Sequence, residues 1–145
     1  MSKKTWFVSS KSFGYDASRL LWILIVTAVT VLLVINKSWW SILFGVLLLC
    51  VILFNVQVYL GKERLLVKVL WVPVKSIQIK DIQRVYIPKN SPFFERNTFG
   101  IHSIVDSWSI HVGAADLEVQ MSDNRFFRLT TGKPEKFLDE LSHIE

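Results

Sequence analysis

Two long apolar stretches near the N-terminus constrain this chain more than any other feature. They run from Leu20 to Ile35 and from Trp39 to Leu60, and only Asn36-Lys37-Ser38 separates them. As a helix the second stretch would be about 33 Å long, which matches a hydrocarbon core of about 30 Å. The first stretch is long enough if its helix starts at Ala17. The pattern therefore predicts a transmembrane helical hairpin with spans of about 17–35 and 39–60.

Basic residues on both sides of the hairpin predict its orientation, because positive residues close to membrane spans are retained on the cytoplasmic side. Only Lys37 lies in the connecting loop. The flanking basic residues are Lys3, Lys4, Lys11, Arg19, Lys62, Arg64 and Lys68. We therefore expect a multi-pass protein of the cell membrane with both termini cytoplasmic, in which Arg19 reaches the lipid headgroups.

Residues 1–16 form a cytoplasmic segment in which lysines alternate with aromatic side chains. Two interpretations are open. The segment lies at the membrane interface, with aromatic rings at the acyl boundary and lysines on anionic headgroups. Alternatively, it is a frayed tail that only enforces the orientation.

From Gly61 onward the apolar pattern changes to a period of two, which predicts strands. Residues 61–145 are expected to form one cytoplasmic domain. Its short antiparallel strands are expected at 64–71, 75–79, 83–87, 108–112, 117–121 and 125–129, and an amphipathic helix is expected from Pro134 to His143. This α+β arrangement suggests a small barrel or sandwich closed by the helix. Its expected core is Leu65, Val67, Val69, Ile77, Ile79, Val85, Trp108, Ile110, Leu117, Val119 and Phe137.

The run from Glu63 to Val85 resembles the opening of bacterial pleckstrin-homology-like domains. There a strand pair is followed by a corner that here contains Ile77, Asp81, Ile82 and Val85. Two transmembrane helices directly before such a domain resemble the layout of YdbS/YdbT-like and EbsA-like membrane proteins. The resemblance implies a small antiparallel pleckstrin-homology-like β-barrel or sandwich with a C-terminal helix, anchored by the hairpin.

Charge is unevenly distributed in the predicted domain. Residues 62–89 contain seven Lys and Arg and two acidic residues, whereas residues 90–145 contain five and nine. The basic half predicts contact with the anionic inner leaflet of the bilayer. The predicted membrane-surface residues are Arg64, Lys68, Lys75 and Lys80; a solvated strand face is the alternative. Nucleic acid is not an expected partner, because no basic stripe carries interleaved aromatic residues.

The connection from Asn90 to Ser107 is too apolar for an ordinary solvated loop. In one interpretation Ile101 to Val105 is a further strand and the phenylalanines cover the barrel. In the other, Phe93, Phe94 and Phe99 form a surface patch that binds a partner.

No catalytic or cofactor-binding pattern stands out, so no enzyme, cofactor or metal site is expected. His102, His111 and His143 are widely spaced, and His111 should lie on the outer face of its strand. His102, Ser103 and Asp106 have the residue types of a nucleophilic triad, but groups within five residues rarely converge. The single cysteine, Cys50, excludes an intramolecular disulfide.

These observations favour a non-enzymatic interaction or scaffold protein of the bacterial cell envelope. Its partner would be another membrane or envelope protein, or a second copy of the chain. One alternative is an immunity or tolerance protein that protects the membrane against a membrane-active peptide such as a bacteriocin. A second alternative is a homo-oligomeric pore.

Overall fold

A helical hairpin interrupts a β unit between its first and second strands. The structure is a computed structural model, which describes residues 6–12, 17–104 and 107–143. The chain divides into two compact units. The helical unit comprises Tyr15–Phe54, and the β unit combines Met1–Gly14 with Asn55–Glu145.

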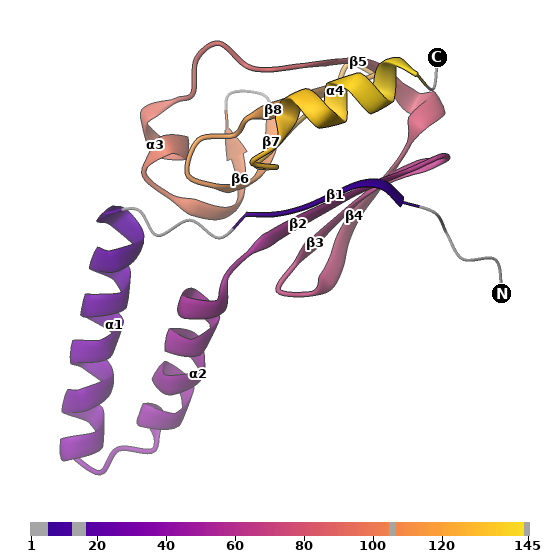
Figure 1. Cartoon of the computed structure of the whole chain (residues 1–145). Helices are drawn as coiled ribbons and strands as arrows, with labels where there is room; N and C mark the ends of the chain where they lie inside the picture. Colours follow the sequence, from indigo (N-terminus) through magenta and orange to yellow (C-terminus); the bar gives the residue numbers. More distant parts are fainter. Residues whose placement is uncertain (1–5, 13–16, 105–106, 144–145) are drawn as a thin grey trace, which may run out of the picture. The chain divides into compact units, whose positions relative to one another are not determined.

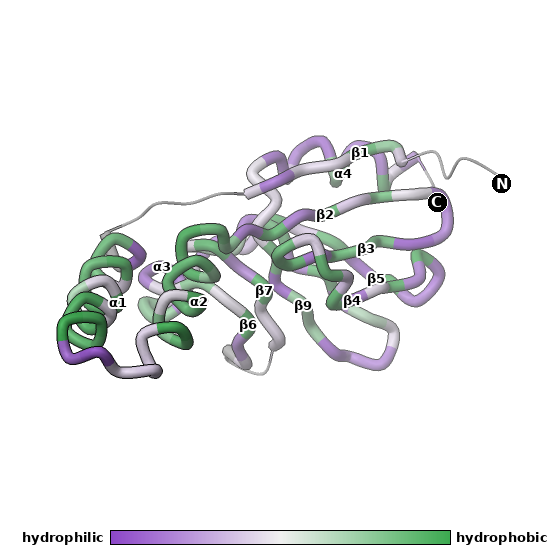
Figure 2. Tube along the Cα trace, turned by 90° about the horizontal axis from the view of Figure 1, so that it is seen from below, coloured by the Kyte–Doolittle hydropathy of each residue, from purple (hydrophilic) through white to green (hydrophobic). Residues whose placement is uncertain are grey.

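The helical unit consists of two antiparallel helices, α1 (Ala17–Ile35) and α2 (Trp40–Leu53) (Figure 1). Both are apolar along nearly their whole length (Figure 2). The predicted turn at Asn36-Lys37-Ser38 is present, and Lys37 has a positive φ of 52°. The helices and their turn are thus the part of the hairpin prediction that the structure retains.

Arg19 closes the C-terminal end of α2. Its side chain is fully buried, and its guanidinium donates hydrogen bonds to the carbonyl oxygens of Val51, Ile52 and Phe54 at 2.9, 3.1 and 2.6 Å. The last carbonyls of a helix have no partner inside the helix, so a cation at this end stabilises the termination. The expectation that Arg19 reaches the lipid headgroups is therefore wrong, because its guanidinium binds the end of α2.

The second apolar stretch is not one helix. α2 has 14 residues and is about 21 Å long, and the chain continues as strand β2 (Val56–Gly61). Within the described ranges, no helix is both long and apolar enough to cross a membrane. The predictions of a transmembrane helical hairpin and of a multi-pass membrane protein with cytoplasmic termini are therefore wrong.

The first sheet of the β unit contains four antiparallel strands in the order β1-β2-β3-β4. The strands are β1 (Trp6–Ser12), β2, β3 (Arg64–Val69) and β4 (Val72–Gln78). Ser12 pairs with Val56, so β1 adds an edge strand across the inserted hairpin. Over residues 6–12 the predicted N-terminal segment is thus part of a sheet; its residues 1–5 and 13–16 lie outside the described ranges.

The second sheet contains five strands in the order β5-β8-β9-β7-β6. Its strands are β5 (Ile82–Tyr86), β6 (Phe99–Ile104), β7 (Ser107–Val112), β8 (Leu117–Met121) and β9 (Phe126–Leu129). The β7 and β9 strands are parallel, and the other pairs are antiparallel. A short helix, η1 (Ile79–Asp81), leads into β5, α3 (Phe93–Arg96) precedes β6, and α4 (Pro134–Ser142) follows β9.

The predicted fold class, a transmembrane hairpin followed by an antiparallel pleckstrin-homology-like barrel or sandwich, is therefore wrong. The described strands belong to two separate sheets, one of them mixed. Local alternation predicted most strands, but it carries no information on which strands become neighbours.

The core largely follows the expected alternation. Phe137 of α4 is fully buried, whereas Ile79 and Val85 are half-buried. The other expected core residues that are buried are Leu65, Val67, Val69, Ile77, Ile110, Leu117 and Val119. Trp108, the remaining residue of the expected core, is 53% exposed, so this assignment is wrong.

Candidate interaction surface

The single turn of α3 inverts the usual distribution of side chains. Glu95 is fully buried, whereas Phe93 is 77% exposed and Phe94 is 53% exposed. Successive helical residues differ by about 100° around the axis, so Phe93 lies about 200° from Glu95. With Glu95 directed into the protein, Phe93 must point into solvent.

Hydrogen bonds from Arg128, Ala115 and Ser109 hold the Glu95 carboxylate. Arg128 donates from Nε to Oε2 at 2.8 Å and from Nη2 to Oε1 at 3.0 Å. The Ala115 N–H donates to Oε1 at 3.0 Å, and the Ser109 hydroxyl donates to Oε2 at 3.2 Å. Burial raises the pKa of Glu95, but the bonds from Arg128 and Ala115 outweigh it and hold the pKa below its usual value. Glu95 is thus a charged anchor with a two-pronged arginine contact.

A row of polar side chains crosses the second sheet beneath this anchor. Cross-strand pairing aligns Tyr86 with Glu118, Glu118 with Arg128, Arg128 with Ser109, and Ser109 with His102. Glu118 accepts hydrogen bonds from Arg128 Nη1 and from the Tyr86 hydroxyl. That bond to the Glu118 carboxylate raises the pKa of Tyr86. Four residues are too few for a stable isolated helix. The single turn of α3 therefore depends on the hydrogen bonds that Arg128 and Ser109 of this row donate to Glu95.

The aromatic ring of Phe94 in α3 packs against two histidine rings, one after the other. The Phe94 ring meets the His102 ring edge-on at 5.1 Å, and the His102 and His111 ring centroids are also 5.1 Å apart. His111 is fully buried, with Nδ1 2.9 Å from the Gly113 carbonyl oxygen, and burial lowers its pKa. The expectation that His111 lies on an outer face is therefore wrong, because α3 and its flanking chain make this a covered face.

The three predicted partner-binding residues differ in exposure and lie on two different elements. Phe93 and Phe94 are neighbours on α3 and exposed, whereas Phe99 is half-buried in β6. Both interpretations of the connection apply in part, since Ile101 to Ile104 do form a strand; Val105 lies outside the described residues. The binding role of these phenylalanines stays a prediction.

The predicted basic surface is divided between two faces. Arg64 and Lys68 share the outer face of β3 with Leu66, whereas Lys75 pairs with Val67, whose side chain is buried on the opposite face. The Lys75 ammonium stands 4.6 Å from the Phe127 ring centroid, and Lys80 lies in η1. Contact of these residues with anionic lipid stays a prediction, but the four do not form one strand face.

The triad-like residues do not share one face. His102 and Ser103 are consecutive in β6, so their side chains point to opposite sides of the sheet. Asp106 lies outside the described ranges. The structure instead groups Glu95, Glu118, Arg128 and Tyr86, which the sequence interpretation did not select. For Glu118 in β8 and Arg128 in β9, the signal in the sequence was a charged residue between two apolar neighbours of the same strand.

The strand pair and corner that carry the family resemblance are present as β3, β4, η1 and β5. Membership of the pleckstrin-homology-like group stays a prediction. No protein-family model, curated protein or solved structure matches the chain.

Proposed function

We propose that this chain is a non-enzymatic protein-interaction module whose docking element is the pair Phe93 and Phe94. One observation carries the proposal: two adjacent phenylalanines are 77% and 53% exposed on a turn whose third residue is a fully buried carboxylate. Apolar area removed from water contributes about 25 cal/mol per Å². Buried aromatic anchors of this kind dominate the energy of many protein interfaces.

The anchoring of α3 also supports binding. Glu95 fixes the turn through Arg128, Ala115 and Ser109, so a partner need not order the segment that carries the two rings. Less conformational entropy is then lost on association, and affinity rises without new contacts.

The partner is a protein with an apolar pocket that accepts Phe93 and Phe94. Arg96 is exposed at the end of the same turn, which favours an acidic residue on the rim of that pocket. A charge at the rim affects the rate of association more than the final affinity.

The test uses a photo-crosslinking phenylalanine analogue at position 93 of the full chain, expressed in its native cells. A discrete adduct is expected, and it should disappear when Phe94 is also changed to Ser. The matched control places the analogue at Trp108, which has the same 53% exposure as Phe94. The absence of a discrete adduct, or an identical adduct from position 108, would show that α3 does not dock a partner.

A further inference from the structure

A groove runs between strand β5 and helix α4, at one edge of the second sheet (Figure 1). It has a volume of about 630 Å³ and is lined by residues of η1, β5 and α4. This volume lies within the range of pockets that bind ligands. Five of the lining residues are half-buried and aliphatic: Ile79, Ile82, Val85, Leu138 and Leu141.

The groove follows the edge of β5 rather than one face of the sheet. β5 is the first strand in the order β5-β8-β9-β7-β6, so it pairs with β8 and with no other described strand. Arg84 and Val85 are consecutive in β5, so their side chains point to opposite faces of the sheet. Both line the groove. A cavity that contacts side chains on both faces must pass along the backbone between them.

An open strand edge is itself a binding element. It presents a row of backbone N–H and C=O groups that no neighbouring strand occupies. An extended peptide can pair with such an edge as an added strand, and pockets beside the edge then select its side chains. The 5 residues of β5 span about 17 Å, so the edge accommodates a segment of about five residues.

On one side of this edge the groove is apolar. Val85 pairs with Val119, which is fully buried, so Val85 lies on the core side of the sheet. Leu138 and Leu141 are three positions apart in α4 and therefore lie on one face of the helix. Val85, Leu138 and Leu141 thus form the apolar wall of the groove. All three are only half-buried, so an aliphatic side chain placed against them would remove further apolar area from water.

On the other side of the edge the groove is basic. Arg84 and Lys80 are exposed and line it, and none of its nine lining residues is acidic. Asp139 and Glu140 of α4 line a separate cavity, together with residues of β1. A basic rim without a competing carboxylate in the wall favours an acidic ligand.

The charge of Arg84 argues against a second copy of the chain as the ligand. Arg84 is the third of the 5 residues in β5. Two copies of β5 paired antiparallel in full register would therefore place their Arg84 side chains opposite each other. Like charges directly opposite each other on paired strands are destabilising. A peptide can instead place an acidic residue at this position.

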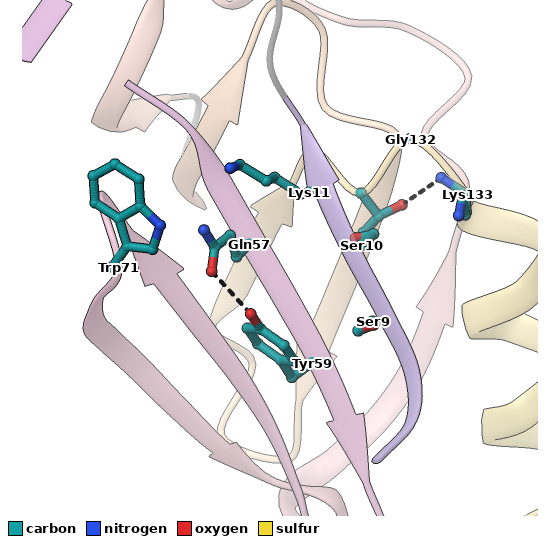
Figure 3. A pocket seen from close by; sticks show the side chains of 9 residues that line it. Ser9, Ser10, Lys11, Gln57, Tyr59, Trp71, Gly132 and Lys133 are labelled. Atoms are coloured by element: carbon teal, nitrogen blue, oxygen red, sulfur yellow. Dashed lines mark hydrogen bonds between the residues drawn. The ribbon is translucent and has the colours of Figure 1, made fainter. Parts of the chain in front are cut away.

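A second edge strand, β1, also borders a cavity, of about 600 Å³. Figure 3 shows its lining, in which the amide oxygen of Gln57 accepts a hydrogen bond from the Tyr59 hydroxyl. None of its nine lining residues is Val, Leu or Ile. A strand added to β1 would therefore find no aliphatic wall, whereas the groove beside β5 provides one.

We propose that the groove between β5 and α4 binds an extended peptide in which aliphatic and acidic residues alternate. The peptide pairs with β5, its aliphatic side chains contact the apolar wall, and its acidic side chains contact Arg84. The alternation follows from the pleat, because successive side chains of a strand point to opposite faces. The proposal is independent of the interaction through Phe93 and Phe94.

Fluorescence anisotropy of a labelled Val-Glu-Val-Glu-Val peptide with the full chain tests this proposal. Saturable 1:1 binding is expected below about 1 mM, and no saturation at that concentration overturns the proposal. Val-Lys-Val-Lys-Val should bind at least about tenfold more weakly. Alternate N–H groups of a strand face the same neighbour, so N-methylation at the valines or at the glutamates, but not both, should weaken binding at least about tenfold. Any other result with the methylated peptides would exclude pairing with β5.

Reversing the charge of Arg84 tests the basic side of the groove. Arg84→Glu should weaken binding of Val-Glu-Val-Glu-Val at least about tenfold and strengthen binding of Val-Lys-Val-Lys-Val. Arg84 is exposed, so the variant should remain folded. Arg64→Glu in β3 is the matched control, since Arg64 is exposed and lies outside the groove. Equal effects of the two substitutions would overturn the proposal.

Hydrogen exchange locates the bound peptide. The β5 amides should exchange more slowly when the peptide is present, whereas the amides of β6, at the opposite edge of the same sheet, should be unchanged. Protection of β6 alone, or of neither strand, would overturn the proposal. Protection of β5 that increases with protein concentration in the absence of peptide would identify a second copy as the occupant, and would overturn it equally.

Discussion

Glu95 determines which side chains of α3 are exposed, although its own side chain is fully buried. A buried carboxylate is tolerated only when it is paired and hydrogen-bonded, and Arg128, Ala115 and Ser109 meet this condition. Because α3 has one turn, directing Glu95 inward directs the two phenylalanines outward. The exposed apolar residues are thus a consequence of a buried ion pair.

Replacing Glu95 by Ala should lower the free energy of unfolding by about 3–5 kcal/mol, because the buried Arg128 loses a partner on two of its nitrogens. Urea denaturation measures this difference. Glu63→Ala is the matched control, since Glu63 is exposed and should change stability by less than about 0.5 kcal/mol. Equal effects of the two substitutions would mean that the ion pair does not support the fold.

His111 should make stability depend on pH. Burial holds its folded pKa below the usual 6.5, so below pH 6.5 the unfolded chain binds more protons than the folded one. Stability is therefore complete above pH 6.5 and falls as the pH falls from 6.5 towards the folded pKa. The loss is about 1.4 kcal/mol for each pH unit that separates the unfolded and folded pKa values.

The measurement compares unfolding in urea at about pH 7 and pH 5, on either side of the ordinary histidine pKa. His111→Gln should reduce the difference between the two conditions, whereas His143→Gln, at an exposed residue, should preserve it. An unchanged difference in the His111 variant would contradict the assignment.

At the scale of elements, the β3–β4 hairpin closes through an unfavourable turn. Two-residue hairpin turns with positive φ at both positions prefer Asn-Gly, but this one contains Leu70 and Trp71. The turn between β8 and β9 follows the preference at Asn124, whose φ is 61°. Hence, of these two turns, only the one between β3 and β4 has side chains that its backbone conformation does not favour.

The double substitution Leu70→Asn and Trp71→Gly should raise the free energy of unfolding by about 1–2 kcal/mol, because it removes two strained backbone conformations. Thermal unfolding reports the change. In the converse experiment, Asn124→Leu should destabilise the protein by about 1 kcal/mol. A double variant less stable than the wild type would show that Leu70 and Trp71 contribute packing that exceeds the strain.

At the scale of the whole molecule, the first sheet combines chain segments that precede and follow the helical unit in the sequence. β1 and β2 are antiparallel neighbours, and Ser12 and Val56 are paired residues at their ends. Paired residues lie about 5 Å apart, so a short turn can connect these strands. The helical unit is therefore an insertion into a β-hairpin connection.

Replacing residues 13–54 by a linker of about four glycine and serine residues should leave the β unit folded, because the paired strand ends are close together. Circular dichroism and hydrogen exchange at the β1 and β2 amides measure this outcome. Deletion of residues 1–12 is the control and should destabilise the unit, since it uncovers the edge of β2. An unfolded linker variant would show that the β unit requires the helices.

Local sequence determined several elements of this protein. Alternation of apolar residues predicted strands at β3, β5, β7 and β8, and the apolar stripe with an initial proline predicted α4 and the burial of Phe137. The exposure of Phe93 and Phe94 was one of two interpretations that the sequence left open. These features depend on periodicity within a few residues, which a single sequence records directly.

Only the tertiary structure decided where the second apolar stretch changes from helix to strand. Val56, Val58 and Leu60 alternate, but a continuous apolar run conceals this period. The strand forms because β1 and β3 pair with it on either side, and Arg19 closes the preceding helix. The Glu95 and Arg128 pair likewise joins residues 33 positions apart. Such partners are distant in the chain, so their contacts depend on the arrangement of the sheets and no local pattern specifies them.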